Sequence, residues 1–205
     1  MKSSFFATRR EFLQTIPMAA AGAALAGAAW PLANLAQGES PSGASAGGPE
    51  NPSWSITIPP AGEPGEPLVV SGTIFAPDGT TPVEGARLYV YHTDARGYYS
   101  IDGRNERQPR LRGWMKTRAD GRYQFRTVRP ASYPNQRFAA HIHSTLGAPG
   151  YPEKWVEEFL FEGDRFLTQR EIDRFSRGGR FGSIQKAVRD ADGVWRYERD
   201  LRVVR

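Results

Sequence analysis

The sequence predicts an all-β fold, an antiparallel β-sandwich with one short helical insertion. Among the 205 residues are 22 glycines and 16 prolines, and 39% are hydrophobic, a composition that suits short strands joined by many turns. Short segments in which apolar and polar residues alternate are separated by turn sequences. One capping-box sequence, at residues 168–171, marks the helix. A chain of this length is expected to form one folded domain.

Residues 1–46 are predicted to be an export segment with a flexible linker. Residues 8–14, TRREFLQ, form a twin-arginine (Tat) pattern, and a short run rich in Ala and Gly follows. Pro17 and Pro31 flank this run, which makes it a poor membrane span. Cleavage fits residues 44–46 and, less well, residues 33–36. We therefore expect the Tat machinery to export the protein to the periplasm or the cell exterior, with no stable membrane anchor after processing.

Charge and cysteine content exclude some classes of site. The net charge is +5, but acidic and basic residues are interleaved, so no nucleic-acid site is predicted. The chain has no cysteine, and a metal site would therefore use nitrogen and oxygen ligands. No oligomeric state follows from the sequence.

The first strands of the mature domain, residues 47–205, follow a linker rich in Gly, Ser and Pro. Alternation over residues 54–58 predicts a brief strand. Residues 68–75 and 85–91 predict two longer strands, and a Pro-Asp-Gly turn at residues 77–79 is expected to join them as an antiparallel pair.

The middle of the domain continues the β pattern. Residues 104–111 are charged and predict a loop. Residues 113–117 and 122–126 predict a second hairpin, closed by an Asp-Gly turn. A strand around residues 141–143 and an extended segment at 156–161 follow.

The last part contains the helix and a final strand. Thr168 and Glu171 have capping-box spacing and predict a helix start, and Gly178 and Gly179 end it. Residues 194–203 predict the closing strand.

His141-Ile142-His143 is the main candidate for a functional site. Side chains alternate along a strand, so the two imidazoles point to the same face. Tyr133 lies eight residues upstream in a Pro-Ala-Ser-Tyr-Pro turn, and Tyr99 lies further upstream. Two imidazoles and two phenols form a ligand set for ferric iron. Alternatively, the histidines are a solvent-facing or hydrogen-bonded pair, and His92 is expected to form hydrogen bonds rather than bind metal.

Residues 72–164 resemble the intradiol ring-cleavage dioxygenases, non-haem ferric enzymes that include protocatechuate 3,4-dioxygenase and catechol 1,2-dioxygenase. The matching motifs lie at residues 72–91, 94–100 (DARGYYS), 117–134 and 140–143 (AHIH), with a weaker match at 161–164 (FEGD).

The resemblance implies a β-sandwich with a non-haem Fe(III) ion between its sheets. It implies metal ligation by Tyr99, Tyr133, His141 and His143, with Tyr133 as the axial ligand that leaves when substrate binds. Tyr98, beside Tyr99, is the alternative for the equatorial tyrosine. A catechol-type substrate and O2 would give a muconate-type dicarboxylate. Phenolate oxygen suits a hard trivalent ion.

Two positions depart from the family pattern. The family has an arginine three positions before the first histidine, where this chain has Phe138, with Arg137 one residue earlier. A one-residue offset reverses the facing direction on a strand, but a bulge could return Arg137 to the site, so it stays a catalytic candidate. Glu158 replaces a family glutamine, and its carboxylate would disfavour a nearby anionic substrate. Both departures favour a differently shaped pocket for neutral or larger catechols.

A second reading is a non-catalytic exported binding module. Residues 70–91 and 116–130 also resemble the transthyretin-like or carboxypeptidase regulatory-like β-sandwich. This alternative explains neither Tyr133 nor the histidine pair.

Overall fold

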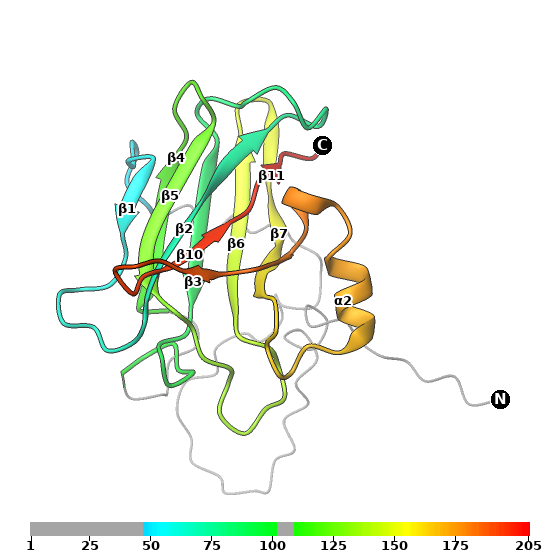
Figure 1. The fold of residues 1–205 in the computed structure, drawn as a ribbon. Coiled ribbons are helices and arrows are strands. Elements are labelled where there is room, and N and C mark those ends of the chain that lie inside the picture. Colours follow the sequence, from blue (N-terminus) through cyan, green and yellow to red (C-terminus); the bar gives the residue numbers. More distant parts are fainter. Residues whose placement is uncertain (1–46, 102–108) are drawn as a thin grey trace, which may run out of the picture. The chain divides into compact units, whose positions relative to one another are not determined.

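The computed structural model describes residues 47–101 and 109–205 (Figure 1). The predicted export segment, both predicted cleavage sites and most of the predicted loop at 104–111 lie outside the described residues. No helix among the residues described is long and apolar enough to cross a membrane.

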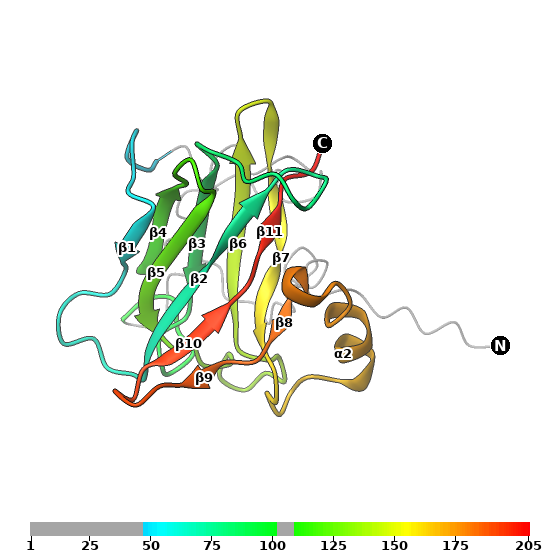
Figure 2. The ribbon, with the colours of Figure 1, turned by 45° about the horizontal axis from the view of Figure 1, so that its top comes forward.

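Two sheets stack against each other, as Figures 1 and 2 show. The first has the order β1-β5-β2-β10-β9, with β11 also paired to β2, and the second has the order β4-β3-β6-β7-β8. Most neighbours are antiparallel, whereas β1–β5, β10–β2, β11–β2 and β7–β8 are parallel. The predicted β-sandwich is confirmed. Its strands are β1 (Ser55–Thr57), β2 (Pro67–Phe75), β3 (Arg87–His92), β4 (Leu111–Lys116), β5 (Arg122–Val128), β6 (His141–Ala148), β7 (Tyr151–Phe161), β8 (Ile184–Gln185), β9 (Val188–Arg189), β10 (Trp195–Glu198) and β11 (Leu201–Arg202).

The core lies between the two sheets. Val70 and Phe125 from the first sheet meet Leu88 and Ile142 from the second, and all four are fully buried. Burying one such side chain stabilises the fold by about 1.5–3 kcal/mol. Because strand side chains alternate, the residues flanking Ile142 point away from this core, and this alternation decides where the candidate site lies.

The two predicted hairpins are wrong, although the strands themselves are present. β2 pairs with β5, and β3 pairs with β4 and β6, so the turn at 77–79 connects different sheets. The Asp-Gly turn before β5 likewise connects the second sheet to the first. Gly121 in this turn has φ +70°, and a Cβ atom there would lie 2.7 Å from the Ile74 carbonyl oxygen. Each strand has one apolar face. When the chain crosses from one sheet to the other, the apolar faces of the two successive strands pack against each other in one core.

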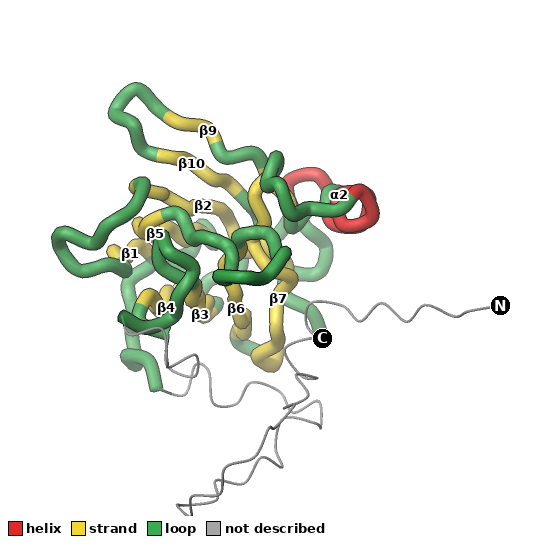
Figure 3. The backbone as a smooth tube through the Cα atoms, turned by 90° about the horizontal axis from the view of Figure 1, so that it is seen from below, coloured by secondary structure: helices red, strands yellow, loops and turns green. Residues whose placement is uncertain are grey.

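The helical insertion, α2 (Gln169–Phe175), begins as predicted. The Thr168 side chain accepts from the Glu171 backbone N–H, and the Glu171 carboxylate accepts from the Thr168 backbone N–H. Phe166 and Phe175 pack against Leu160 of β7. The helix α2 lies at one side of the two sheets (Figure 3). A 3₁₀ turn, η2 (Gly179–Phe181), follows. The predicted closing strand is divided into β10 and β11.

Candidate metal centre

Four side chains converge on one point near the start of β6. The Tyr99 and Tyr133 Oη atoms are 2.5 Å apart, and the His141 and His143 Nε2 atoms are 3.0 Å apart. Tyr133 Oη lies 3.0 Å from His141 Nε2 and 3.3 Å from His143 Nε2, which is itself 3.0 Å from Tyr99 Oη. Ligands of a single ion with bonds of about 2.1 Å have similar spacing, about 3 Å between neighbouring donor atoms.

The chemistry of these donor atoms fits a cation. His141 Nδ1 donates to the Ala139 carbonyl oxygen at 2.7 Å, so the lone pair is on Nε2, which faces Tyr133 Oη and His143 Nε2. Lone pairs brought this close repel one another unless a proton or a cation lies between them. No group of three or more His, Cys, Asp or Glu residues suited to a metal occurs among residues 47–101 and 109–205, so the site depends on its two phenols.

The site lies on the outer face of the second sheet. Ile142 is fully buried in the core, and its neighbours His141 and His143 therefore point the opposite way. The resemblance implied a metal ion between the two sheets. This expectation is wrong, because His141 and His143 lie on the outer face of the second sheet. Both histidines are nevertheless buried, with 7% and 4% of their surfaces exposed, because loops cover this part of the sheet.

Tyr99 is placed by a tight turn that follows β3. The Asp94 carboxylate accepts from the Tyr98 backbone N–H at 3.0 Å, and Gly97 in the turn has φ +89°. Tyr98 is 37% exposed, whereas the Tyr99 hydroxyl lies beside His143. Of the two adjacent tyrosines, the structure brings Tyr99 to the histidines.

Tyr133 is placed by the loop between β5 and β6, which is bonded to the Tyr99 turn. The Thr93 hydroxyl donates to the Ala131 carbonyl oxygen at 2.7 Å, and the Ala131 N–H donates to the Asp94 carbonyl oxygen at 3.1 Å. A Cβ atom on Gly97 would lie 2.1 Å from the Ser132 carbonyl oxygen. The two tyrosines are therefore held by one joined pair of loops.

Further contacts fix the backbone on either side of the site. The Asp164 carboxylate, in the FEGD turn, accepts from the backbone N–H groups of Ala140 and Phe166, both at 2.9 Å. The Arg110 N–H donates to the Tyr99 carbonyl oxygen at 2.8 Å, and its guanidinium binds Glu63 at 2.5 and 2.7 Å. The hydrogen bonds from Arg110 lower the pKa of Glu63.

Sequence reasoning missed Tyr91 as a neighbour of the site. Its ring stacks on His143, with centroids 4.7 Å apart and an interplanar angle of 23°. Tyr91 and His143 are register partners on β3 and β6, so correct strand pairing would have revealed the contact. Burial raises the pKa of Tyr91, which keeps this phenol neutral.

His92 lies outside the group of four. Its Nδ1 donates to the Thr93 carbonyl oxygen, and its Nε2 accepts from the Thr127 hydroxyl, both at 2.7 Å. Burial lowers the pKa of His92 to about 4, so the ring is neutral. His92 thus joins the two sheets by hydrogen bonds, in line with the role expected from the sequence.

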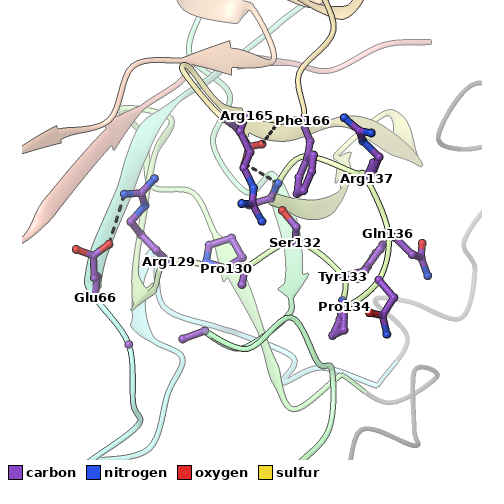
Figure 4. Close-up of a pocket in the computed structure, with 16 residues that line it drawn as sticks. Glu66, Arg129, Pro130, Ser132, Tyr133, Pro134, Gln136, Arg137, Arg165 and Phe166 are labelled. Carbon is purple, nitrogen blue, oxygen red and sulfur yellow. Dashed lines mark hydrogen bonds and ion pairs between the residues drawn. The ribbon is translucent and has the colours of Figure 1, made fainter.

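A pocket of about 830 Å³ borders Tyr133 (Figure 4). Arg137 is exposed and lines this pocket, whereas Tyr99, His141 and His143 are not among its lining residues. The Phe138 ring stands edge-on to Tyr133 at 6.3 Å, so an aromatic ring lies where the family arginine was expected. Glu158 does not line this pocket. The full lining comprises Gly65, Glu66, Ala95, Arg129, Pro130, Ala131, Ser132, Tyr133, Pro134, Asn135, Gln136, Arg137, Ala140, Asp164, Arg165 and Phe166.

Known proteins share this fold and sequence pattern. A family model described as dioxygenase matches residues 46–191. The chain is 31% identical over 156 residues to 6-chlorohydroxyquinol 1,2-dioxygenase of Cupriavidus pinatubonensis, covering 68% of this chain and 54% of the relative. It is 40% identical over 113 residues to catechol 1,2-dioxygenase 1 of Acinetobacter lwoffii, covering 52% of this chain and 36% of the relative. The chain thus spans about half or less of the length of these relatives.

Solved structures agree at the level of the fold. The dioxygenase domain of a dioxygenase–carbohydrate-binding fusion from Streptomyces sp. SirexAA-E superimposes with a TM-score of 0.54 at 25% identity, covering 76% of this chain and 92% of that domain. Catechol 1,2-dioxygenase from Acinetobacter sp. ADP1 superimposes with a TM-score of 0.55 at 23% identity, covering 76% of this chain and 59% of that enzyme. The family match and the related sequences together show that this chain belongs to the intradiol ring-cleavage dioxygenase family.

Proposed function

We propose that this protein is a non-haem Fe(III)-dependent intradiol dioxygenase. In this proposal it cleaves a catechol-type ring with O2 between the two hydroxylated carbons and releases a muconate-type dicarboxylate. The observation that carries the proposal is the convergence of two phenol oxygens and two imidazole nitrogens, because Tyr133 Oη and His143 Nε2 each lie within 2.5–3.3 Å of the other three atoms. Relatives named as catechol and hydroxyquinol 1,2-dioxygenases support the reaction class.

The donor set favours ferric iron over other common metals. Tyr99 and Tyr133 offer hard anionic oxygen once deprotonated, and His141 and His143 complete the set with imidazole nitrogen. Structural zinc sites more often use cysteine, which this chain lacks. When bound, ferric iron would supply Lewis acidity that stabilises the phenolate forms of the tyrosines and of a catechol.

The protein's own residues have separate tasks in this proposal. Tyr133 borders the pocket, so a catechol entering there contacts it, and the Tyr133 phenolate can accept a hydroxyl proton from the substrate. Tyr99 keeps its place through the Arg110 bond to its backbone. His141 and His143 stay fixed because β6 lies between β3 and β7.

The pocket supports a substrate larger than catechol itself. Its volume of about 830 Å³ lies in the upper part of the range of about 300–1,000 Å³ found for small-molecule sites. Arg129, Arg137 and Arg165 are among its lining residues. Arg137 is therefore placed to contact a substrate bound in the pocket.

We also propose that the protein works outside the cytoplasm. The twin-arginine sequence at residues 8–14 supports Tat export. Cell fractionation tests this proposal, because replacement of Arg9 and Arg10 by lysine should retain the protein in the cytoplasm. Unchanged export of that variant would contradict it.

Oxygen uptake by the iron-loaded protein tests the proposed reaction. With a panel of substituted catechols, we expect uptake of O2 for at least one member and both oxygen atoms of labelled O2 in a dicarboxylate product. An aldehyde-containing product would mean cleavage outside the two hydroxylated carbons. That product, or no uptake over the whole panel, would contradict the proposal, and the second outcome would favour the binding-module alternative.

A further inference from the structure

A β-bulge on β7 lies directly opposite His143. Ile142 pairs with Phe159 and Ser144 pairs with Val156, so one residue of β6 faces two residues of β7. The two residues of β7 that lie opposite His143 are Glu157 and Glu158. A bulge of this kind bends a strand and redirects its side chains, and bulges are common beside functional sites.

The bulge changes the face on which Glu158 lies. Val156 packs against the core, and strict alternation from it would turn Glu158 toward the core as well. Phe159 also points into the core, so the bulge instead leaves both glutamates on the outer face, where the candidate metal centre lies. There the Glu158 carboxylate is 3.9 Å from His143 Nδ1, and its side chain is 14% exposed.

Arg199 fixes this bulge from the opposite side of the sheet. Its Nη1 donates to the backbone carbonyl oxygens of Glu157 at 2.8 Å and Glu158 at 3.1 Å. Its Nη2 donates to the Ser183 hydroxyl at 3.1 Å, and its guanidinium lies 4.8 Å from the centre of the Phe159 ring. Arg199 is 3% exposed. A buried guanidinium is costly unless its donors are satisfied, and the Nε of Arg199 is buried without a hydrogen-bond partner among the described residues. Its bonds to both bulge carbonyls offset part of this cost only in the bulged geometry, and they therefore stabilise it.

We propose that Glu158, held on the outer face by the bulge that Arg199 stabilises, is a positioning residue for His143. The negative carboxylate beside Nδ1 favours the tautomer with its proton on Nδ1 and its lone pair on Nε2, the atom that faces Tyr99 and Tyr133. A distance of 3.9 Å exceeds that of a direct hydrogen bond, so the effect acts through the electric field in this buried setting. It complements the Ala139 carbonyl oxygen, which sets the tautomer of His141.

With Glu158 in this role, His141 and His143 have the same tautomer, with the proton on Nδ1, but different groups favour it in each ring. Metal-binding histidines commonly direct their second ring nitrogen at a carbonyl or carboxylate oxygen, which fixes the ring and its tautomer. Here a main-chain carbonyl serves His141 and a side-chain carboxylate serves His143. The inference rests on the proposed metal role of His143, but its effect on the tautomer exists without metal.

The ring ¹⁵N chemical shifts of His143 in the metal-free full-length protein test this inference directly. We expect the Nδ1–H tautomer to predominate in the wild type and the Nε2–H tautomer to increase severalfold in Glu158→Gln, which keeps the shape and removes the charge. Glu157→Gln is the matched control, because Glu157 belongs to the same bulge but is exposed. The His92 signals serve as an internal reference. Identical His143 shifts in Glu158→Gln and the wild type would overturn the proposal.

Two further measurements separate this inference from the proposed function. The ferric dissociation constant, measured against a competing chelator, should rise about 10–100-fold in Glu158→Gln, as for other residues that orient metal ligands, and stay near the wild-type value in Glu157→Gln. Arg199→Lys should reproduce the His143 tautomer change, and an unchanged tautomer in that variant would remove Arg199 from the proposal. A wild type that binds no ferric ion would contradict the proposed function, whereas the tautomer comparison would still decide the role of Glu158.

Discussion

Replacing His141 with alanine is expected to abolish ferric-ion binding while the β-sandwich stays folded. The His141 ring lies on the outer face of the sheet, and its Nε2 is within 3.0 Å of both Tyr133 Oη and His143 Nε2. Its loss removes one of four donor atoms and the hydrogen bond to the Ala139 carbonyl oxygen, which is worth about 1 kcal/mol. Iron content after reconstitution and thermal unfolding of the metal-free variant measure the two effects separately.

His92→Ala is the matched control and should show the opposite pattern. His92 bonds to Thr93 and Thr127 between the sheets, so its removal leaves a cavity and an unsatisfied hydroxyl at a cost of about 2–4 kcal/mol. Its iron content should match that of the wild type once the protein is folded. Iron bound at the wild-type level by His141→Ala would show that this histidine is not a ligand.

Gly97→Ala is expected to disrupt the site through the backbone rather than through a ligand. The added Cβ would lie 2.1 Å from the Ser132 carbonyl oxygen, so the turn that carries Tyr99 and the loop that carries Tyr133 must separate. A positive φ of +89° adds a further cost of about 1–2 kcal/mol for a residue with a Cβ atom. The steric contact and the positive φ together are expected to lower the free energy of unfolding by about 2–4 kcal/mol and to abolish ferric absorption.

Gly150→Ala provides the control for the backbone conformation alone. Gly150 has φ +78°, and a Cβ atom there would have no neighbour within 4 Å. This variant should lose only the conformational term of about 1–2 kcal/mol and keep normal ferric absorption. Urea unfolding and the visible spectrum of the reconstituted variants supply both readouts. Equal stability and equal absorption in the two variants would show that the Gly97 contact does not hold the site together.

The strands and the start of the helix could be predicted from the sequence, whereas the pairing of the strands could not. Alternation in residues 68–75 and 85–91 is a local property, and so is the hydrogen bonding of Thr168 with Glu171. A turn such as Asp120-Gly121 has the same chemistry whether its strands stay in one sheet or cross to the other. The shared core decides between these outcomes, and a core formed by distant segments is not visible in a local pattern.

Local alternation also predicted part of the candidate site. The contacts that depend on strand pairing and on sheet packing could not be predicted in this way. The alternation around Ile142 places His141 and His143 on one face, but which face is the core depends on the opposite sheet. The contact of Tyr91 with His143 and the bulge at Glu158 depend on strand register. Arg199 is far from β7 in sequence, and only the folded chain brings its guanidinium to the bulge.

Titration of the purified metal-free protein with ferric ion, followed by visible absorption, tests whether Tyr99, Tyr133, His141 and His143 form a ferric site. Phenolate bound to ferric iron absorbs visible light, so we expect a coloured complex that saturates at one ion per chain. Tyr133→Phe should weaken or shift this absorption, whereas Tyr98→Phe, which alters the exposed neighbour of Tyr99, should leave it unchanged. A protein that stays colourless at saturation, or one that loses its colour in Tyr98→Phe and keeps it in Tyr133→Phe, would contradict this account of the metal centre.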